Sequence, residues 1–164
     1  MVGQKIFSRL GKRLKEFATG ADGRSRLLEI LSRQYIEEVH AVREFTAQLD
    51  RLEYPQFRER LRKIIASEEE HVRWLRGKIS ELGGEIPEVP SVSISCRNAW
   101  ESFSKGLEDE RRGIADLEEA ELAARHIDPE TADTLRRIRE DEERHRETIV
   151  DMLTRSDPQA HLSR

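Results

Sequence analysis

Apolar residues recur at alternating steps of three and four along four long stretches of the chain, the spacing that lines one face of a helix. The clearest case lies within residues 55–82, where this face consists of Leu61, Ile65, Glu68, Val72, Leu75, Ile79 and Leu82. Only Glu68 among them is charged. Burying a carboxylate is costly without a partner. His71 lies about one helical turn further on and can reach the same point.

The other three stretches repeat this pattern, each with one glutamate on an otherwise apolar face. In the helix predicted over about residues 25–52 the face is Leu28, Leu31, Tyr35, Glu38, Val42, Phe45, Leu49 and Leu52. In the third helix it is Trp100, Phe103, Leu107, Glu110, Ile114 and Leu117. In the fourth helix it is Thr131, Leu135, Ile138, Glu142, His145, Ile149 and Met152.

Local signals place the ends of these helices. Tyr54-Pro55 is a short turn with proline suited to a first helical turn, and Gly83-Gly84 is a typical helix stop. Asn98 and Glu101 resemble a capping box, and Asp128-Pro129 is typical of an N-cap followed by the first helical residue. The proline-containing segment 85–95 is expected to be extended, reaching about 40 Å, which is the length of a helix of about 28 residues. We therefore predict an all-α four-helix bundle with a long crossover between its second and third helices.

A short amphipathic helix is predicted over residues 5–17, with an apolar face from Ile6 to Phe17 and a basic surround. It either docks on an acidic membrane surface or a partner protein, or packs on its own bundle or within an oligomer. Residues 20–23, Gly-Ala-Asp-Gly, are interpreted as a hinge. The expected organisation is an N-terminal segment 1–23, a bundle 24–154 and a frayed tail 155–164.

Composition narrows the function classes. The chain has 164 residues, of which 38% are charged, and a net charge of -4, so nucleic acid is not an expected partner. Cys96 is the only cysteine, which excludes an internal disulfide and a cysteine-based metal cage. No apolar run approaches the length that spans a membrane, and we see no secretory signal. We expect a cytoplasmic protein, with peripheral attachment to a membrane as a further option through residues 5–17.

The charged residues on the four faces form two matching halves. Glu38 is followed by Glu68-x-x-His71 after 30 residues, and Glu110 is followed by Glu142-x-x-His145 after 32. The chain is thus a diverged internal duplication. The alternative to a metal site is four buried glutamates that are protonated or paired with arginine, but no lysine or arginine lies beside them on these faces. Two divalent cations would balance four carboxylates, so the pattern favours a dinuclear metal site.

The remaining histidines do not fit this pattern. His40 repeats the motif with Glu37, but it lies about 200° around the helix from Glu38 and is expected to face solvent or a neighbouring flank. His126 and His161 are expected at the surface.

These residues resemble the ferritin-like di-iron carboxylate family, with the run from Glu68 to Pro87 most similar to rubrerythrins and bacterioferritins. The resemblance implies that Glu68 and Glu142 bridge two metals, with Glu38 and His71 completing one site. Glu110 and His145 would complete the other.

Several positions depart from the family pattern. Glu69 stands where bacterioferritins carry the haem-binding methionine, so no haem is expected. Gly113 stands where rubrerythrins supply an extra glutamate, and Phe45 where relatives often have a tyrosine. No rubredoxin-like module follows. Tyr35 and Trp100 would serve in core packing or in electron relay.

Carboxylate and imidazole ligands suit iron, with manganese or zinc as competitors. The resemblance implies a di-iron oxidoreductase that oxidises Fe(II) with O2 or H2O2. The alternatives are an iron-storage subunit, an oxidase of an organic substrate, and a docking adaptor whose metal site is structural. A homo-oligomer is expected.

Overall fold

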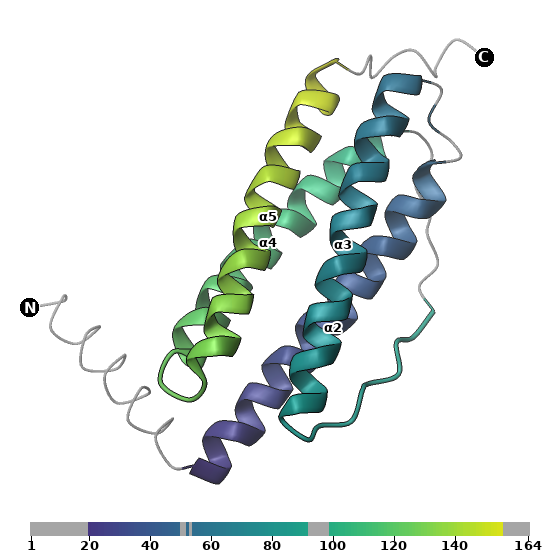
Figure 1. Cartoon of the computed structure of the whole chain (residues 1–164). Coiled ribbons are helices and arrows are strands. Elements are labelled where there is room, and N and C mark those ends of the chain that lie inside the picture. The colour runs from purple at the N-terminus through teal and green to yellow at the C-terminus, as the bar shows by residue number, and fades with distance from the viewer. Residues whose placement is uncertain (1–19, 50–51, 53, 92–98, 156–164) are drawn as a thin grey trace, which may run out of the picture.

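The computed structural model describes residues 20–49, 52, 54–91 and 99–155, and within them it contains four helices and no strand. The helices are α2 (Gly20–Leu49), α3 (Pro55–Glu81), α4 (Ala99–Ala124) and α5 (Pro129–Arg155). Figure 1 shows them as one elongated bundle, with α3 and α5 in front of α2 and α4. The predicted all-α four-helix class is confirmed. The helix predicted over residues 5–17, Asn98, His161 and the tail 156–164 lie outside the described residues.

Two helix pairs make up the bundle, α2 with α3 and α4 with α5, each joined by a short connection (Figure 1). The crossover leaves α3 at Leu82 and runs back along α2. There the His40 Nε2–H donates to the carbonyl oxygen of Pro90 at 3.2 Å, and Arg43 donates to the same oxygen at 3.0 Å. These bonds attach the described part of the crossover to α2, as the predicted topology requires.

The local signals act as expected at the described helix ends. Pro55 is the first residue of α3, and Gly83, with φ of 67°, turns the chain after the helix. Only glycine adopts this left-handed conformation without strain. The Arg24 Nε donates to the carbonyl oxygen of Leu82 at 2.9 Å, which satisfies one of the carbonyls left free at the end of α3. At α5, the Glu130 amide donates to Asp128 Oδ1 at 3.3 Å.

The core consists of two apolar clusters with a polar layer between them. One cluster contains Leu27, Leu31, Leu75, Ile79, Leu117, Ala120, Ala124, Ala132, Leu135 and Ile138. The other contains Phe45, Leu52, Phe57, Leu61, Ile64, Phe103, Ile149 and Met152. On every helix the predicted glutamate falls between its contributions to the two clusters. The apolar clusters therefore hold the polar layer at the middle of the bundle.

Some details of the predicted pattern are wrong. Trp100 is 40% exposed, because it lies in the first turn of α4, beyond Phe103, where the packed bundle ends. Residues 20–23 belong to α2 and do not form a break, since a helix can continue through glycine at a cost of about 1 kcal/mol each. Conversely, Leu52 lies beyond the end of α2 yet is buried.

The buried face of α2 is also turned relative to the predicted one. Leu28, Tyr35, Val42 and Leu49 are only half-buried, whereas Leu27, Gln34 and Gln48 are buried.

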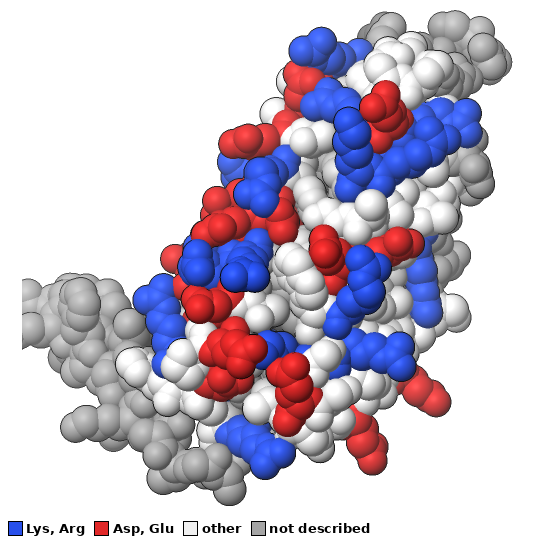
Figure 2. Space-filling model, viewed as in Figure 1, with Lys and Arg blue, Asp and Glu red and all other residues white. Residues whose placement is uncertain are grey.

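The outer surface is highly charged. Figure 2 shows acidic and basic side chains interspersed over the face formed by α3 and α5. Among the described helices, none is both long enough and apolar enough to cross a membrane.

Candidate metal centre

All six predicted site residues lie in the polar layer, and each is at most 7% exposed. They come from all four helices: Glu38 from α2, Glu68 and His71 from α3, Glu110 from α4, and Glu142 and His145 from α5. Their ligand atoms form two groups, in each of which the atoms lie within 4.8 Å of one another. The first group is Glu38, Glu68, His71 and Glu142, and the second is Glu68, Glu110, Glu142 and His145. Glu68 and Glu142 therefore belong to both groups.

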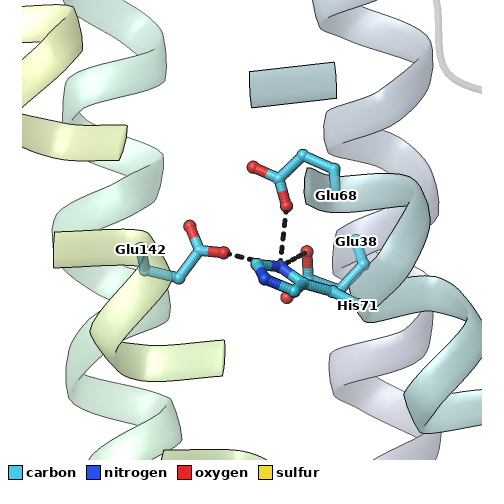
Figure 3. A group of neighbouring side chains, drawn as sticks. All are labelled: Glu38, Glu68, His71 and Glu142. Carbon is cyan, nitrogen blue, oxygen red and sulfur yellow. Dashed lines mark hydrogen bonds and ion pairs between the residues drawn. The ribbon is translucent and has the colours of Figure 1, made fainter. Parts of the chain in front are cut away.

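The first group is arranged around one ring nitrogen of His71 (Figure 3). His71 Nδ1 lies 3.1 Å from Glu142 Oε1, 3.2 Å from Glu68 Oε2 and 3.5 Å from Glu38 Oε2. Three carboxylates from three helices thus face a single nitrogen atom. A cation at their centre would be within reach of all four side chains.

The second group repeats this arrangement around His145. Its Nδ1 lies 3.0 Å from Glu68 Oε1 and 3.6 Å from Glu142 Oε2. The two imidazole rings are stacked, with centroids 5.7 Å apart. The two halves of the duplication therefore meet with their histidines side by side and share two carboxylates.

The second ring nitrogen of His71 is held by a residue that the sequence pattern did not reveal. His71 Nε2 lies 3.3 Å from Asp141 Oδ2, and Asp141 is itself paired with Arg144. Because a carboxylate only accepts, Nε2 carries the proton here, and Nδ1 is then the nitrogen that faces the other carboxylates. A signal was present, since Asp141 precedes Glu142 as Ser67 precedes Glu68. Asp141 lies off the apolar face of its helix, however, so the pattern of apolar residues does not indicate it.

Burial and mutual repulsion shift the pKa values of these groups strongly. Burial, followed by the charges of Glu142 and Glu68, raises the pKa of Glu38 well above its ordinary 4.5. Burial and the neighbouring carboxylates also raise the pKa of Glu110. For Glu142, burial acts upward, but the close approach of Glu110, His145 and His71 outweighs it and lowers the pKa. Without metal, the cluster therefore retains protons.

The pKa values of the two histidines are both raised. Burial opposes the charged form of His145, but Glu142 and Glu68 outweigh it and raise the pKa of His145 to about 9. The pKa of His71 is likewise raised, because Glu142, Glu38 and Glu68 outweigh its burial. In the absence of metal, protons on these rings supply positive charge that partly balances the four buried carboxylates.

Buried polar atoms that lack hydrogen-bond partners indicate whether these residues fit metal ions. Glu68 Oε1, Glu110 Oε2, Glu142 Oε1 and His145 Nδ1 are buried without a hydrogen-bond partner among the described residues. His145 Nδ1 and Glu68 Oε1 are close, at 3.0 Å, yet their orientation is not that of a hydrogen bond. Such atoms are expensive to bury unless they bind something. Four carboxylates and two imidazoles fit two divalent cations in charge and in ligand type.

The other candidate residues lie elsewhere. His40 contacts the crossover, and His126 and Glu69 are exposed. Tyr35 packs against the apolar cluster of Leu27. Gln34, which sequence analysis missed, is buried one turn before Glu38, and its Nε2 has no partner among the described residues.

The fold and the buried layer define a ferritin-like four-helix bundle. Residues 29–153 match the family model described as rubrerythrin, and the chain therefore belongs to the rubrerythrin family. No curated protein matches the sequence.

Solved structures of similar fold agree with this assignment. A ferritin-like diiron-carboxylate protein from Bacillus anthracis str. Ames has a TM-score of 0.73 at 20% identity, covering 79% of this chain and 96% of its own. The bacterioferritin of Desulfovibrio desulfuricans has a TM-score of 0.76 at 20% identity, covering 84% and 83%. A dodecameric thioferritin from Bacteroides fragilis has a TM-score of 0.71 at 20% identity, covering 85% and 93%. At these identities the likeness concerns the fold.

Proposed function

We propose that this chain binds two iron ions and oxidises Fe(II) with O2 or H2O2. The observation that carries the proposal is the sharing of Glu68 and Glu142 between two ligand groups. In this assignment Glu38 and His71 complete one site, and Glu110 and His145 complete the other. The family supports the assignment, because the ferritin-like carboxylate proteins hold metals in this way. Manganese or zinc would compete for the same ligands.

The protein environment explains why two neighbouring iron ions suit this chemistry. Reducing O2 to peroxide, or H2O2 to water, takes two electrons, and two neighbouring Fe(II) ions would supply one each. The shared carboxylates keep the two positions adjacent, and anionic ligands favour the ferric product. The His71–Asp141–Arg144 contacts fix one imidazole in orientation before any metal arrives. The two apolar clusters keep bulk water from the two ends of the polar layer.

Two other functions would use the same residues. Iron storage is favoured by the likeness to bacterioferritin and to a dodecameric relative, and for this reason we also propose that the chain self-associates. A docking adaptor with a structural metal site remains the alternative from a different class. The number of irons retained per chain, measured together with the sedimentation coefficient, separates storage from catalysis.

The test uses metal-free protein loaded anaerobically with Fe(II) and mixed with O2 or H2O2 in a stopped-flow spectrophotometer. We expect two irons per chain and ultraviolet absorbance that rises faster than for buffered Fe(II) alone. Glu68→Ala and Glu142→Ala should each lose bound iron, because each removes a ligand from both positions. His40→Ala is the matched control and should retain the full metal content, since His40 belongs to neither ligand group and its ring binds the crossover.

The outcomes separate the alternatives. Full metal content in both glutamate variants would overturn the shared-ligand assignment. Two bound irons that oxidise no faster than free Fe(II) would favour a structural site. Fast oxidation with far more than two irons retained per soluble chain would favour storage.

A further inference from the structure

A cavity of about 320 Å3 lies between α2 and α4 and reaches the candidate metal centre. Glu38, Glu110 and Glu142 line it, whereas His71, His145 and Glu68 do not. The centre is therefore approached from the side of these carboxylates, away from the stacked histidines. The cavity is partly open, so a molecule entering from solvent would meet the metal ligands at its inner end.

The cavity is far larger than a peroxide or dioxygen molecule needs. A site for one water-sized molecule requires about 10–15 Å3 of such space. Pockets that bind small organic molecules begin at about 300 Å3. The volume therefore fits a ligand with an organic substituent, not only a diatomic group.

One part of the cavity wall is apolar. Ala41, Phe45 and Leu117 contribute side chains, and Gly106 and Gly113 contribute backbone. A Cβ added at Gly113 would meet no heavy atom within 4 Å, whereas one at Gly106 would lie 3.4 Å from the Phe45 ring. Gly113 thus leaves open the part of the cavity that a larger side chain would fill. An alkyl or aryl group would fit against this wall.

Besides the carboxylates, a side-chain amide in the wall has no partner among the described residues. Gln34 lines the cavity and is 1% exposed, and its Nε2 has no hydrogen-bond partner among the described residues. An amide N–H buried in this way is available to donate to an oxygen atom of a ligand. Gln34 lies one turn before Glu38, so a ligand oxygen close to the metal ligands could accept a hydrogen bond from its amide.

The two basic residues that line the cavity, Lys105 and Arg112, are each paired with an acidic side chain. Lys105 Nζ lies 2.6 Å from Glu44 Oε2 and 3.6 Å from Asp109 Oδ2, and Arg112 is also paired with Asp109. The Lys105–Glu44 pair connects α4 to α2. Four further glutamates line the cavity, so its acidic residues outnumber its basic ones and an anionic ligand is disfavoured relative to a neutral one.

We propose that this cavity binds an organic hydroperoxide, with the O–O group toward the metal ligands and the organic substituent against Phe45 and Leu117. The proposal rests on the proposed function, since the electrons come from the Fe(II) pair. The O–O bond of ROOH breaks as two Fe(II) become two Fe(III), and two protons are taken up to give ROH and water. Gln34 is a positioning residue that donates to an oxygen of the hydroperoxide.

The first test compares single-turnover rates of the Fe(II)-loaded protein with cumene hydroperoxide and with H2O2. The natural chain should react with both. In Gly113→Leu the ratio of the cumene hydroperoxide rate to the H2O2 rate should fall at least tenfold, because the added side chain occupies the space for the aryl group. Gly77→Leu is the matched control, because Gly77 lies on α3 and an added Cβ there also meets nothing within 4 Å. Its ratio should stay within twofold of the original.

The second test needs no metal and no turnover. Cumyl alcohol, the product of cumene hydroperoxide, is titrated into metal-free 15N-labelled protein. We expect saturable shifts of the Gly106 and Gly113 amide signals but not of Gly77. Gly113→Leu should weaken the binding at least tenfold.

The experiments distinguish a failure of the cavity proposal from a failure of the proposed Fe(II) oxidation. If H2O2 reacts quickly while cumene hydroperoxide does not react and its alcohol does not bind, the cavity proposal is overturned and the Fe(II) oxidation stands. An unchanged rate ratio in Gly113→Leu would also overturn it. If neither peroxide reacts with protein that holds two irons, the proposed function itself fails.

Discussion

His71 and His145 occupy equivalent positions in the two halves of the duplication, but their surroundings differ. Asp141 from α5 accepts from His71 Nε2, and the residue equivalent to Asp141 in the other half is Ser67, which has a much shorter side chain. Ser67 Oγ lies 3.5 Å from His71 Nε2, at the limit of a hydrogen bond. The sequence predicted the six inward-facing residues because the four glutamates and His145 interrupt apolar faces and His71 lies one turn from Glu68. It did not predict Asp141, whose role depends on a contact across two helices.

At this scale we predict that Asp141→Leu weakens metal binding about 10- to 100-fold, the usual effect of removing a carboxylate that orients a metal-binding histidine. The affinity would be measured anaerobically by competition with a chelator. Ser67→Ala is the control and should change the affinity less than threefold, because its contact with His71 is long. Equal affinities in Asp141→Leu and the natural chain would show that the Asp141 contact does not orient His71 for binding.

The helices differ in how well their buried faces could be predicted. On α5 all seven predicted residues are buried, from Thr131 to Met152. On α2 the prediction was turned by about one residue, because Gln34 and Gln48 are buried and a search for apolar residues cannot find them. Since α2 packs against both α3 and α4, its contact face is wide, and the half-buried Leu28 and Val42 lie toward its edges.

At the scale of one helix, the N-cap predicted at the start of α5 can be tested by mutation. Asp128 accepts from the Glu130 amide and from the Thr131 hydroxyl. Asp128→Ala should therefore lower the free energy of unfolding by about 1 kcal/mol, the usual cost of losing an N-cap. Urea denaturation of the metal-free protein would measure it. The control is Asp133→Ala, an exposed residue paired with Arg136 on the same helix, which should cost less than about 0.5 kcal/mol. Similar losses in both variants would contradict the capping role.

For the whole molecule, the central feature is a charged layer held between two apolar clusters. The repeated halves made this layer predictable, since each glutamate stands near the middle of its helix. The cavity beside it was not predictable, because its size depends on the spacing of α2 from α4 and on the absence of a side chain at Gly113. Binding and access are thus encoded differently, the first by residue type and the second by packing.

The layer leads to a prediction about pH and metal removal. The pKa values of Glu38 and Glu110 are raised from 4.5 on folding, mainly by burial. The folded protein therefore keeps protons that the unfolded chain releases above pH 4.5, and stability falls as pH rises. The pKa of His145, raised from 6.5 to about 9 by Glu142 and Glu68 despite its burial, adds a fall in the same direction between these values. Glu142, whose pKa is lowered, contributes fully above pH 4.5 and does not change this trend.

We therefore expect the melting temperature of the metal-free protein to fall steadily between pH 6 and pH 9. Metal binding requires deprotonated ligands, so it should release protons and grow stronger with pH. The difference in melting temperature between the metal-loaded and metal-free forms should then widen across this range. Calorimetry would measure both quantities, the melting temperatures by scanning and the proton release by titrating metal in buffers of different ionisation enthalpy. A metal-free protein that becomes more stable toward pH 9, or metal binding without proton release, would contradict the protonated state of the layer. His40→Ala serves as the control, since it lies outside the layer and should leave both trends unchanged.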